Sequence, residues 1–182
     1  ETKNFDLIII GGGAAGMMSA ISARRHHKDF KIAIIERTFA MGRKILVAGA
    51  GRCNITNINL DTEVEKRYYG AKKEFVKTIF DQFGYKDIIN FFADLGIETY
   101  VERKTSIGKV FPITDQAHTV TALLDDEISL SGIEVFLNTE CKTLMKVGEG
   151  FEIEAQFYDM KTKEKRDYKF NSKYVIMSAG GK

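Results

Sequence analysis

The chain has 182 residues, of which 44% are hydrophobic and 29% are charged, a composition typical of a folded globular protein. Its formal net charge of +2 is small and its basic residues are scattered, so we expect no nucleic-acid partner. No apolar run approaches the roughly 18 residues that a membrane-spanning helix needs, so we expect no membrane partner. The two cysteines, Cys53 and Cys141, lack metal-type spacing, which favours reduced thiols, a cytoplasmic location and no metal site.

An apolar segment near the N-terminus predicts a buried parallel strand followed by a glycine-rich turn. Residues 5–10 are almost all apolar, and the sequence then reads Gly11-x-Gly13-x-x-Gly16 before an expected helix over 14–25. In this context the first glycine allows a tight turn, the second lets a pyrophosphate approach the backbone, and the third lets helix and strand pack closely. The pattern therefore predicts a pyrophosphate on the free N–H groups of a helix N-terminus.

A second apolar segment, residues 31–35, predicts another strand that ends in Glu36. An acidic residue about 20 positions after Gly16 is placed to bind the ribose hydroxyls of a dinucleotide. A glutamate rather than an arginine at this point argues against a 2′-phosphate, and hence against NADP. Together with the glycine turn, Glu36 indicates dinucleotide binding.

Residues 38–60 are irregular and rich in glycine and polar side chains. A loop of this length inside a compact domain is uncommon unless it has a function. Its donors, among them Lys44, Arg52 and Asn54, suit a phosphate, a ribityl chain or a flavin edge. The alternative is a polar surface loop.

The middle of the chain predicts a helical hairpin and a loop. Apolar residues at helical spacing over 71–83 and 85–95, each followed by glycine, predict two helices whose apolar faces pack in the core. A short strand is expected over 97–102, and a loop over 104–113. A further helix, capped by residue 114 or 115, should follow.

The C-terminal third predicts strands. Residues 133–137 should rejoin the parallel sheet, and a three-stranded antiparallel meander should follow. The meander segments are 141–147, 151–158 and 166–170. A last buried strand over 174–177 then runs into Ser178-Ala179-Gly180-Gly181, where backbone could approach the same ligand.

The order of these elements resembles the first half of a flavoprotein with two dinucleotide-binding domains. More narrowly, GRKILVAGAGRCNITN (Gly42–Asn57) and GKVFP (Gly108–Pro112) resemble signatures of the bacterial aminoacetone-oxidase-like, or BaiN-like, family of FAD-dependent oxidoreductases. The fold class implied is α/β, a Rossmann-like FAD-binding domain over residues 1–182 with a parallel sheet, a helical-hairpin insertion and a three-stranded antiparallel meander. Because family members are longer, the resemblance implies a fragment, with a substrate domain and the completion of the FAD domain beyond Lys182.

The chain departs from the family pattern in two places. It has Ala48-Gly49-Ala50-Gly51 where the family usually has Ser-Gly-Gly-Gly, and Ser178-Ala179 where the family usually has Ala-Thr. Each change is expected to remove a hydroxyl that could bond the cofactor.

The resemblance implies a set of FAD-binding residues, grouped by the part of FAD that they would contact. For the pyrophosphate they are Gly11, Gly13, Ala14, Ala15 and Gly16, with Ala179 and Gly180 on the other side; for the adenosine and phosphate they are Glu36, Arg37, Lys44 and backbone near Cys141; for the ribityl and flavin end they are Gly49, Gly51, Arg52, Cys53 and Asn54. No catalytic side chain is identified, because the sequence offers no paired carboxylates, Ser/His/Asp set or metal cluster.

The predicted function is two-electron redox chemistry on a small organic substrate, with NAD(P)H as a candidate electron donor. One alternative is an NAD-dependent dehydrogenase domain, which would need neither the meander nor the loop over 42–57. Another is a non-catalytic, truncated dinucleotide-binding module with exposed apolar patches. A redox role for Cys53 is not expected, because that chemistry normally uses a Cys-x-x-Cys pair.

Overall fold

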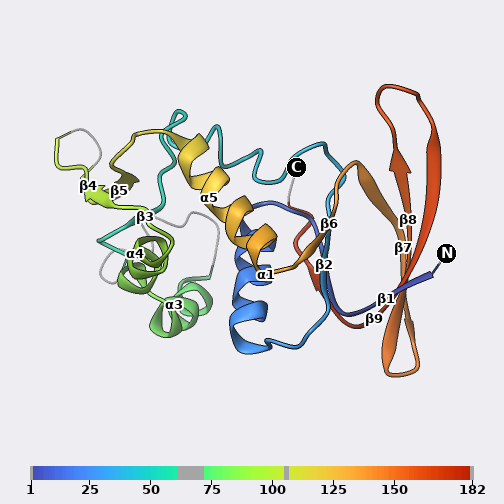
Figure 1. The fold of residues 1–182 in the computed structure, drawn as a ribbon. Helices are drawn as coiled ribbons and strands as arrows, with labels where there is room; N and C mark the ends of the chain where they lie inside the picture. Colours follow the sequence, from blue (N-terminus) through green and yellow to red (C-terminus); the bar gives the residue numbers. More distant parts are fainter. Residues whose placement is uncertain (1, 61–71, 105–106, 181–182) are drawn as a thin grey trace. The chain divides into compact units, whose positions relative to one another are not determined.

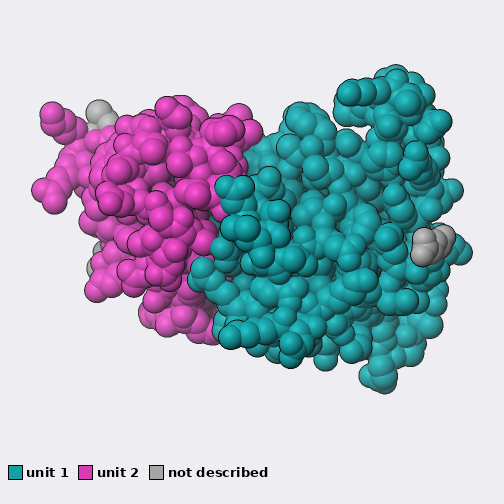
Figure 2. Space-filling model, viewed as in Figure 1, with its two compact units in different colours: residues 1–45, 124–182 teal, residues 46–123 magenta. Residues whose placement is uncertain are grey.

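The structure is a computed structural model that describes residues 2–60, 72–104 and 107–180. Ala71, where the first helix of the hairpin was expected to begin, and Gly181 lie outside the described residues. The chain divides into two compact units, one of residues 1–45 with 124–182 and one of residues 46–123 (Figure 2).

The first unit is built on a six-stranded mixed sheet with the strand order β6-β2-β1-β9-β8-β7 (Figure 1). Its elements are β1 (Thr2–Ile10), α1 (Ala14–His26), β2 (Ile32–Ile35), β6 (Glu134–Phe136), β7 (Thr139–Val147), β8 (Gly150–Tyr158) and β9 (Lys165–Met177). Strand β1 pairs in parallel with β2 and β9, β2 pairs in parallel with β6, and β7, β8 and β9 form an antiparallel meander. The predicted parallel sheet and meander are confirmed.

One long strand replaces two that the sequence predicts separately. The segments 166–170 and 174–177 both belong to β9, which pairs with β8 on one side and with β1 on the other. The polar residues between them do not interrupt the strand, because they are hydrogen-bonded. Ser172 is only 5% exposed, and its hydroxyl donates to the carbonyl of Tyr174 at 2.7 Å and to that of Asp6 at 3.3 Å.

The second half of β1, residues 7–10, is apolar and buried on both faces. Ile8 and Ile10 join the buried cluster that includes Phe5, Ile35 and Phe170. Helix α1 contacts β1, β2 and β9 and buries its own apolar residues. Each fully buried isoleucine or phenylalanine contributes about 1.5–3 kcal/mol relative to an exposed one. This burial fixes the point at which β1 ends and the glycine turn begins.

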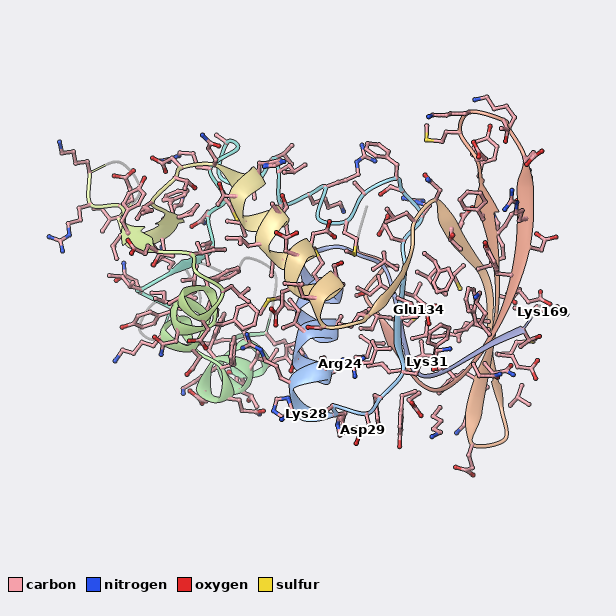
Figure 3. The ribbon with its side chains drawn as sticks, in the orientation of Figure 1. Arg24, Lys28, Asp29, Lys31, Glu134 and Lys169 are labelled. Atoms are coloured by element: carbon pink, nitrogen blue, oxygen red, sulfur yellow. The ribbon has the colours of Figure 1, made fainter. Side chains whose placement is uncertain are left out.

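The basic end of α1 folds back on the chain that follows it. The guanidinium of Arg24 donates from Nη1 to the carbonyl oxygen of Lys28 at 2.5 Å (Figure 3). Arg24, Arg25 and His26 all lie in the last turn, where cations are favourable to the helix dipole. Nearby, Lys31 forms an ion pair with Glu134 at 3.6 Å, joining the starts of β2 and β6.

We predict that Asp6→Asn lowers stability at neutral pH but not in acid. The Asp6 carboxylate accepts from Lys173 Nζ at 2.7 Å and from the Lys31 backbone N–H at 2.8 Å, and these bonds hold its pKa below the usual value. A lowered pKa adds stability above the unfolded-state value, which is lost as the pH falls through the folded-state value. Because the pair is partly exposed, we expect a loss of up to about 1 kcal/mol at pH 7.

The deficit should disappear in acid, once the pH falls below the lowered folded-state pKa and the aspartate is protonated in the folded chain as well as in the unfolded one. Urea unfolding at the two pH values measures both quantities. An equal deficit at neutral and at acid pH would contradict the electrostatic explanation.

The second unit contains a helical hairpin and a small antiparallel sheet with the order β3-β5-β4. Its elements are β3 (Thr56–Asn57), α3 (Lys73–Gln82), α4 (Tyr85–Asp94), β4 (Thr99–Val101), β5 (Lys109–Pro112) and the first turns of α5 (Ala117–Leu130). The hairpin is confirmed. The loop expected over 104–113 is wrong where β5 lies. Strand β3 likewise lies within 38–60, the segment expected to be irregular. Strands this short are defined by their partner strands rather than by an alternating pattern of apolar residues.

The apolar faces of the two hairpin helices have different surroundings. In α4, Phe91 and Phe92 are buried, as predicted. In α3, Val76 is buried as predicted, but Phe75 and Ile79 are 68% and 49% exposed, and Phe83, just after the helix, is 43% exposed, so the core prediction is wrong for these three residues. Helical spacing shows that a face is apolar, but it does not show what covers that face.

Candidate cofactor site

The three motif glycines of the turn have different surroundings. Gly11 has a φ of 106°, and a Cβ there would lie 2.4 Å from the carbonyl oxygen of Ser178. A Cβ on Gly16 would lie 1.9 Å from the carbonyl oxygen of Gly11, which confirms the predicted close packing of helix and strand. A Cβ on Gly13 would meet nothing within 4 Å. The backbone at Gly13 therefore faces open space, as close approach of a ligand requires.

The N-terminus of α1 has no side-chain cap. Its cap residue, Gly13, has extended backbone and makes no side-chain hydrogen bond, and the first turn contains no acidic residue. The first N–H groups of a helix lack partners within the helix and carry partial positive charge. Ala14 and Ala15 leave these groups accessible, so an anion such as a pyrophosphate fits here.

Glu36 is held in one orientation by the turn and by its own loop. Its Oε2 accepts the backbone N–H of Gly12 at 2.7 Å. Its Oε1 accepts the backbone N–H and the hydroxyl of Thr38, each at 2.7 Å. Sequence reasoning did not identify Gly12 or Thr38; the available signals were the third adjacent glycine of the turn and a hydroxyl two residues after the acid.

A cavity of about 230 Å³ lies where β1 and β2 end. It is lined by Ile10, Gly11, Ile35, Glu36, Arg37, Thr139, Glu140, Cys141 and Ala179. Five of these residues are in the set implied by the sequence, and they come from four separate segments. Thr139 and Glu140 were not predicted; Thr139 is placed by its backbone N–H, which donates to the Glu36 carbonyl at 2.9 Å.

Charges of both signs line this cavity. Arg37 lies with two carboxylates, Glu36 and Glu140. An ion pair with Lys142, and more weakly the charge of Arg37, lowers the pKa of Glu140. Burial raises the pKa of the Cys141 thiol, so this side chain is a neutral wall of the cavity.

The end of β9 is joined to the glycine turn by Ser178. Its hydroxyl donates to the carbonyl oxygens of Ile10 at 3.0 Å and Gly11 at 2.8 Å. The expectation that a hydroxyl is lost at this motif is therefore incomplete, because Ser178 supplies one that binds backbone. Lys44 lies close to Gly180, since a Cβ on Gly180 would be 3.6 Å from Lys44 Nζ.

The remaining predicted residues, 49–54, belong to the second unit. A Cβ on Gly49 would lie 2.7 Å from the backbone nitrogen of Asn54, so the loop closes tightly on itself. Cys53 is 6% exposed, and burial raises the pKa of its thiol to about 11. The thiol is therefore protonated at neutral pH, the form in which a cysteine is a poor nucleophile.

Two features are absent from the described residues. No cluster of three or more His, Cys, Asp or Glu side chains that could hold a metal ion is found there. In the same part of the chain, no helix combines the length and the apolar character needed to cross a membrane.

The fold and the glycine turn define a Rossmann-type domain of the FAD-binding class found in flavin-dependent oxidoreductases. The chain belongs to the family described as HI0933-like protein Rossmann domain, which matches residues 5–182. The family resemblance seen in the sequence motifs is confirmed, and FAD is the cofactor of this family. The residues described above fit such a group, because an uncapped helix N-terminus, an open glycine and a cavity lie in one unit.

Curated relatives are longer than this chain. The chain is 35% identical over 174 residues to the 3-dehydro-bile acid delta(4,6)-reductase of Clostridium scindens, spanning 96% of this chain and 38% of the relative. It is 30% identical over 152 residues to the ribosomal RNA dihydrouridine synthase of Escherichia coli, spanning 84% of this chain and 36% of the relative. The chain thus covers less than half the length of these proteins.

Solved structures share the fold. The E. coli quinol fumarate reductase FrdA has a TM-score of 0.69 at 16% identity, with 100% of this chain and 33% of that chain covered. THI4 of Thermovibrio ammonificans has a TM-score of 0.60 at 16% identity, with 97% of this chain and 58% of that chain covered. At these identities the likeness concerns the fold alone.

Proposed function

We propose that the whole protein is an FAD-dependent oxidoreductase that reduces a small organic substrate, and that residues 1–182 hold its cofactor. The observation that carries this proposal is the convergence of Gly11, Glu36, Arg37, Cys141 and Ala179 on one cavity next to the helix N-terminus. Parallel strands carry ligands at their carboxyl ends, which is where this cavity lies.

Each part of the cavity has a proposed role. The pyrophosphate would lie on the N–H groups at the start of α1, over the open face of Gly13, with Lys44 and Gly180 offering a cation and backbone from the end of β9. The ribose would bind Glu36, whose carboxylate is already oriented by Gly12 and Thr38. The adenine would occupy the cavity, with neighbours Arg37 and Cys141.

The loop over residues 49–54 is proposed for the ribityl and flavin end. Its tight backbone and the guanidinium of Arg52 offer donors to an acceptor-rich ligand. FAD supplies two-electron hydride chemistry, so the residues of this domain need only bind, orient and exclude water. No side chain of the described residues is assigned a proton-transfer role.

The names of the relatives support a direction of reaction and a substrate class for the proposal. One is a reductase of a 3-dehydro-bile acid and another forms dihydrouridine in ribosomal RNA, and both names describe reductions. We therefore favour reduction of a substrate double bond, with NAD(P)H as the electron donor. RNA is the second candidate substrate; it is favoured by the relative's name, whereas the small net charge of this chain offers little attraction for phosphates. We also propose a cytoplasmic location, supported by the two free thiols.

The test uses the full-length protein. We expect it to retain about one FAD per chain after desalting, as yellow protein, and its flavin to be bleached anaerobically by NADH or NADPH. Reoxidation of the flavin by an added steroid enone, compared with reoxidation by a uridine-containing RNA fragment, separates the two substrate classes. Protein that retains no flavin after reconstitution would overturn the proposal and would favour a non-catalytic module.

A further inference from the structure

The loop between Ala48 and Asn54 contains a strained left-handed turn. Gly49, Ala50 and Gly51 have φ values of 59°, 57° and 84°, and Cys53 has a φ of 62°. Ala50 and Cys53 are not glycine, and a left-handed conformation costs such a residue roughly 1–2 kcal/mol. Strain of this kind persists only where surrounding contacts hold the backbone in place.

Backbone bonds hold part of this turn. The N–H groups of Gly51 and Cys53 donate to the carbonyl of Ala48 at 3.2 and 2.9 Å, and the carbonyl of Gly51 accepts the N–H of Ala117 at 2.8 Å. The last bond joins the turn to the start of α5. The first two bonds lie within the loop, so they do not fix the loop to the rest of the unit.

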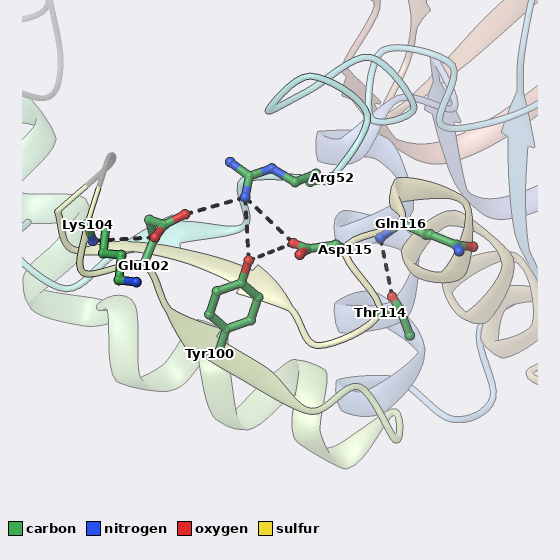
Figure 4. A network of polar contacts seen from close by, with 7 residues as sticks. All are labelled: Arg52, Tyr100, Glu102, Lys104, Thr114, Asp115 and Gln116. Atoms are coloured by element: carbon green, nitrogen blue, oxygen red, sulfur yellow. Dashed lines mark hydrogen bonds and ion pairs between the residues drawn. The ribbon is translucent and has the colours of Figure 1, made fainter.

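Arg52 is the side chain of the turn that reaches other elements of the unit. Its Nη1 lies 3.4 Å from the hydroxyl of Tyr100, 3.5 Å from Glu102 Oε2 and 3.8 Å from Asp115 Oδ1 (Figure 4). Its guanidinium carbon lies 4.0 Å from the ring centre of Phe111. Tyr100 lies in β4, Glu102 directly follows it, Asp115 lies in the segment before α5, and Phe111 lies in β5.

Tyr100 connects the partners to one another. Its hydroxyl donates to Asp115 Oδ1 at 2.7 Å and leaves its oxygen to accept from Arg52. The hydrogen bond to Asp115 raises the pKa of Tyr100, so the phenol stays protonated and the arrangement persists at neutral and mildly alkaline pH. Glu102, whose side chain is 17% exposed, faces the same nitrogen of Arg52.

The contacts engage one side of the guanidinium. Within the described residues, every polar contact of Arg52 runs through Nη1, and the side chain is 34% exposed. Arginine carries five N–H donors in a rigid planar fork, so Nε and Nη2 keep donors available. Two carboxylates therefore fix the orientation of one edge of Arg52, and the other edge is left for a ligand.

We propose that Tyr100, Glu102 and Asp115 are positioning residues, which hold Arg52 and the left-handed turn in the geometry that binds the flavin end of FAD. The inference rests on the proposed function only for the identity of the ligand. The bracing of the turn is a property of the chain itself and can be measured without flavin.

The test compares Tyr100→Phe, Glu102→Gln and Asp115→Asn in the full-length protein, with Asp81→Asn as the control. Asp81 forms an exposed ion pair with Lys77 on α3, so its variant removes a carboxylate of the same unit that does not contact Arg52 within the described residues. In flavin-free protein, we expect the amides of Gly51 and Cys53 to exchange hydrogen about tenfold faster in the three variants. We expect FAD to bind them about tenfold more weakly, and the control to match wild type.

Two further readouts separate positioning from general destabilisation. Glu102→Gln and Asp115→Asn remove negative charge beside Arg52, so they should raise the two-electron potential of the bound flavin, whereas Tyr100→Phe, which keeps the charge, should change it less. Adding Ala50→Gly to Asp115→Asn should restore much of the lost FAD affinity, because glycine adopts the left-handed turn without strain.

The outcomes distinguish this inference from the function on which it rests. Wild-type protein that binds no FAD would overturn the proposed function, while the hydrogen-exchange comparison would still decide whether the network braces the turn. Wild-type protein that binds FAD, with variants that match it in affinity, potential and amide exchange, would overturn the inference alone.

Discussion

Replacing Gly16 with alanine is expected to lower the free energy of unfolding by about 3 kcal/mol, because the new methyl group has no room. Its Cβ would lie 1.9 Å from the carbonyl oxygen of Gly11 and 2.8 Å from the hydroxyl of Ser178. The Ser178 hydroxyl donates a hydrogen bond to this carbonyl oxygen at 2.8 Å, so the two atoms cannot both move aside. Helix α1 must therefore shift away from the end of β1, and FAD binding should be lost along with the packing.

Gly13→Ala is the matched control, since it makes the same chemical change three residues earlier. Its Cβ would meet nothing within 4 Å, and its φ of −76° suits alanine. We expect a stability loss of no more than about 1 kcal/mol, the cost of replacing glycine at a helix cap. FAD affinity should nevertheless fall by about tenfold or more, because the methyl group occupies the space where the pyrophosphate approaches.

Chemical denaturation and titration with FAD measure the two effects separately. Gly16→Ala should lower both the free energy of unfolding and the FAD affinity. Gly13→Ala should lower mainly the FAD affinity. Equal stability of the two variants would show that the close approach at Gly16 is relieved cheaply. Unchanged FAD affinity in Gly13→Ala would show that the pyrophosphate does not lie over this glycine.

The parts of the fold that could be predicted from the sequence are those with a pattern in neighbouring residues. The apolar run of β1, the turn after it and the acid at the end of β2 lie within 36 residues and each has its own pattern. The continuity of β9 has no such signal. Ser172 is buried in this strand because β1 lies beside it, and β1 is more than 160 residues away in sequence. The short strands β3 and β5 likewise depend on each other rather than on composition.

The candidate site also combines residues that a local sequence pattern identifies with residues that only distant parts of the chain bring there. Motif residues such as Gly11 and Glu36 could be identified from spacing, and the structure places them at one cavity. Thr139 and Glu140 reach that cavity because β7 starts where β6 ends, and no residue pattern encodes that position. The partners of Arg52 could not be predicted either, since the nearest of them is 48 residues further along the chain.

Replacing Glu36 with glutamine is expected to weaken FAD binding by about 10- to 100-fold, which corresponds to the loss of hydrogen bonds to a charged acceptor. Both carboxylate oxygens accept backbone N–H groups, Oε2 from Gly12 and Oε1 from Thr38. Glutamine has a single acceptor oxygen, so its amide N–H₂ group must face one of these donors. The side chain should rotate away, and the ribose would lose an oriented carboxylate.

Glu140→Gln is the matched control for this variant, because it removes a carboxylate from the same cavity. Glu140 is paired with Lys142 at a site where both side chains are 47% exposed, and such surface pairs contribute about 1 kcal/mol or less. Titration of both variants with FAD should therefore show a large loss for Glu36→Gln and a small one for Glu140→Gln. Equal losses would mean that FAD affinity depends on the total charge of the cavity. The hydrogen bonds from Gly12 and Thr38 would then not orient Glu36 for the ribose.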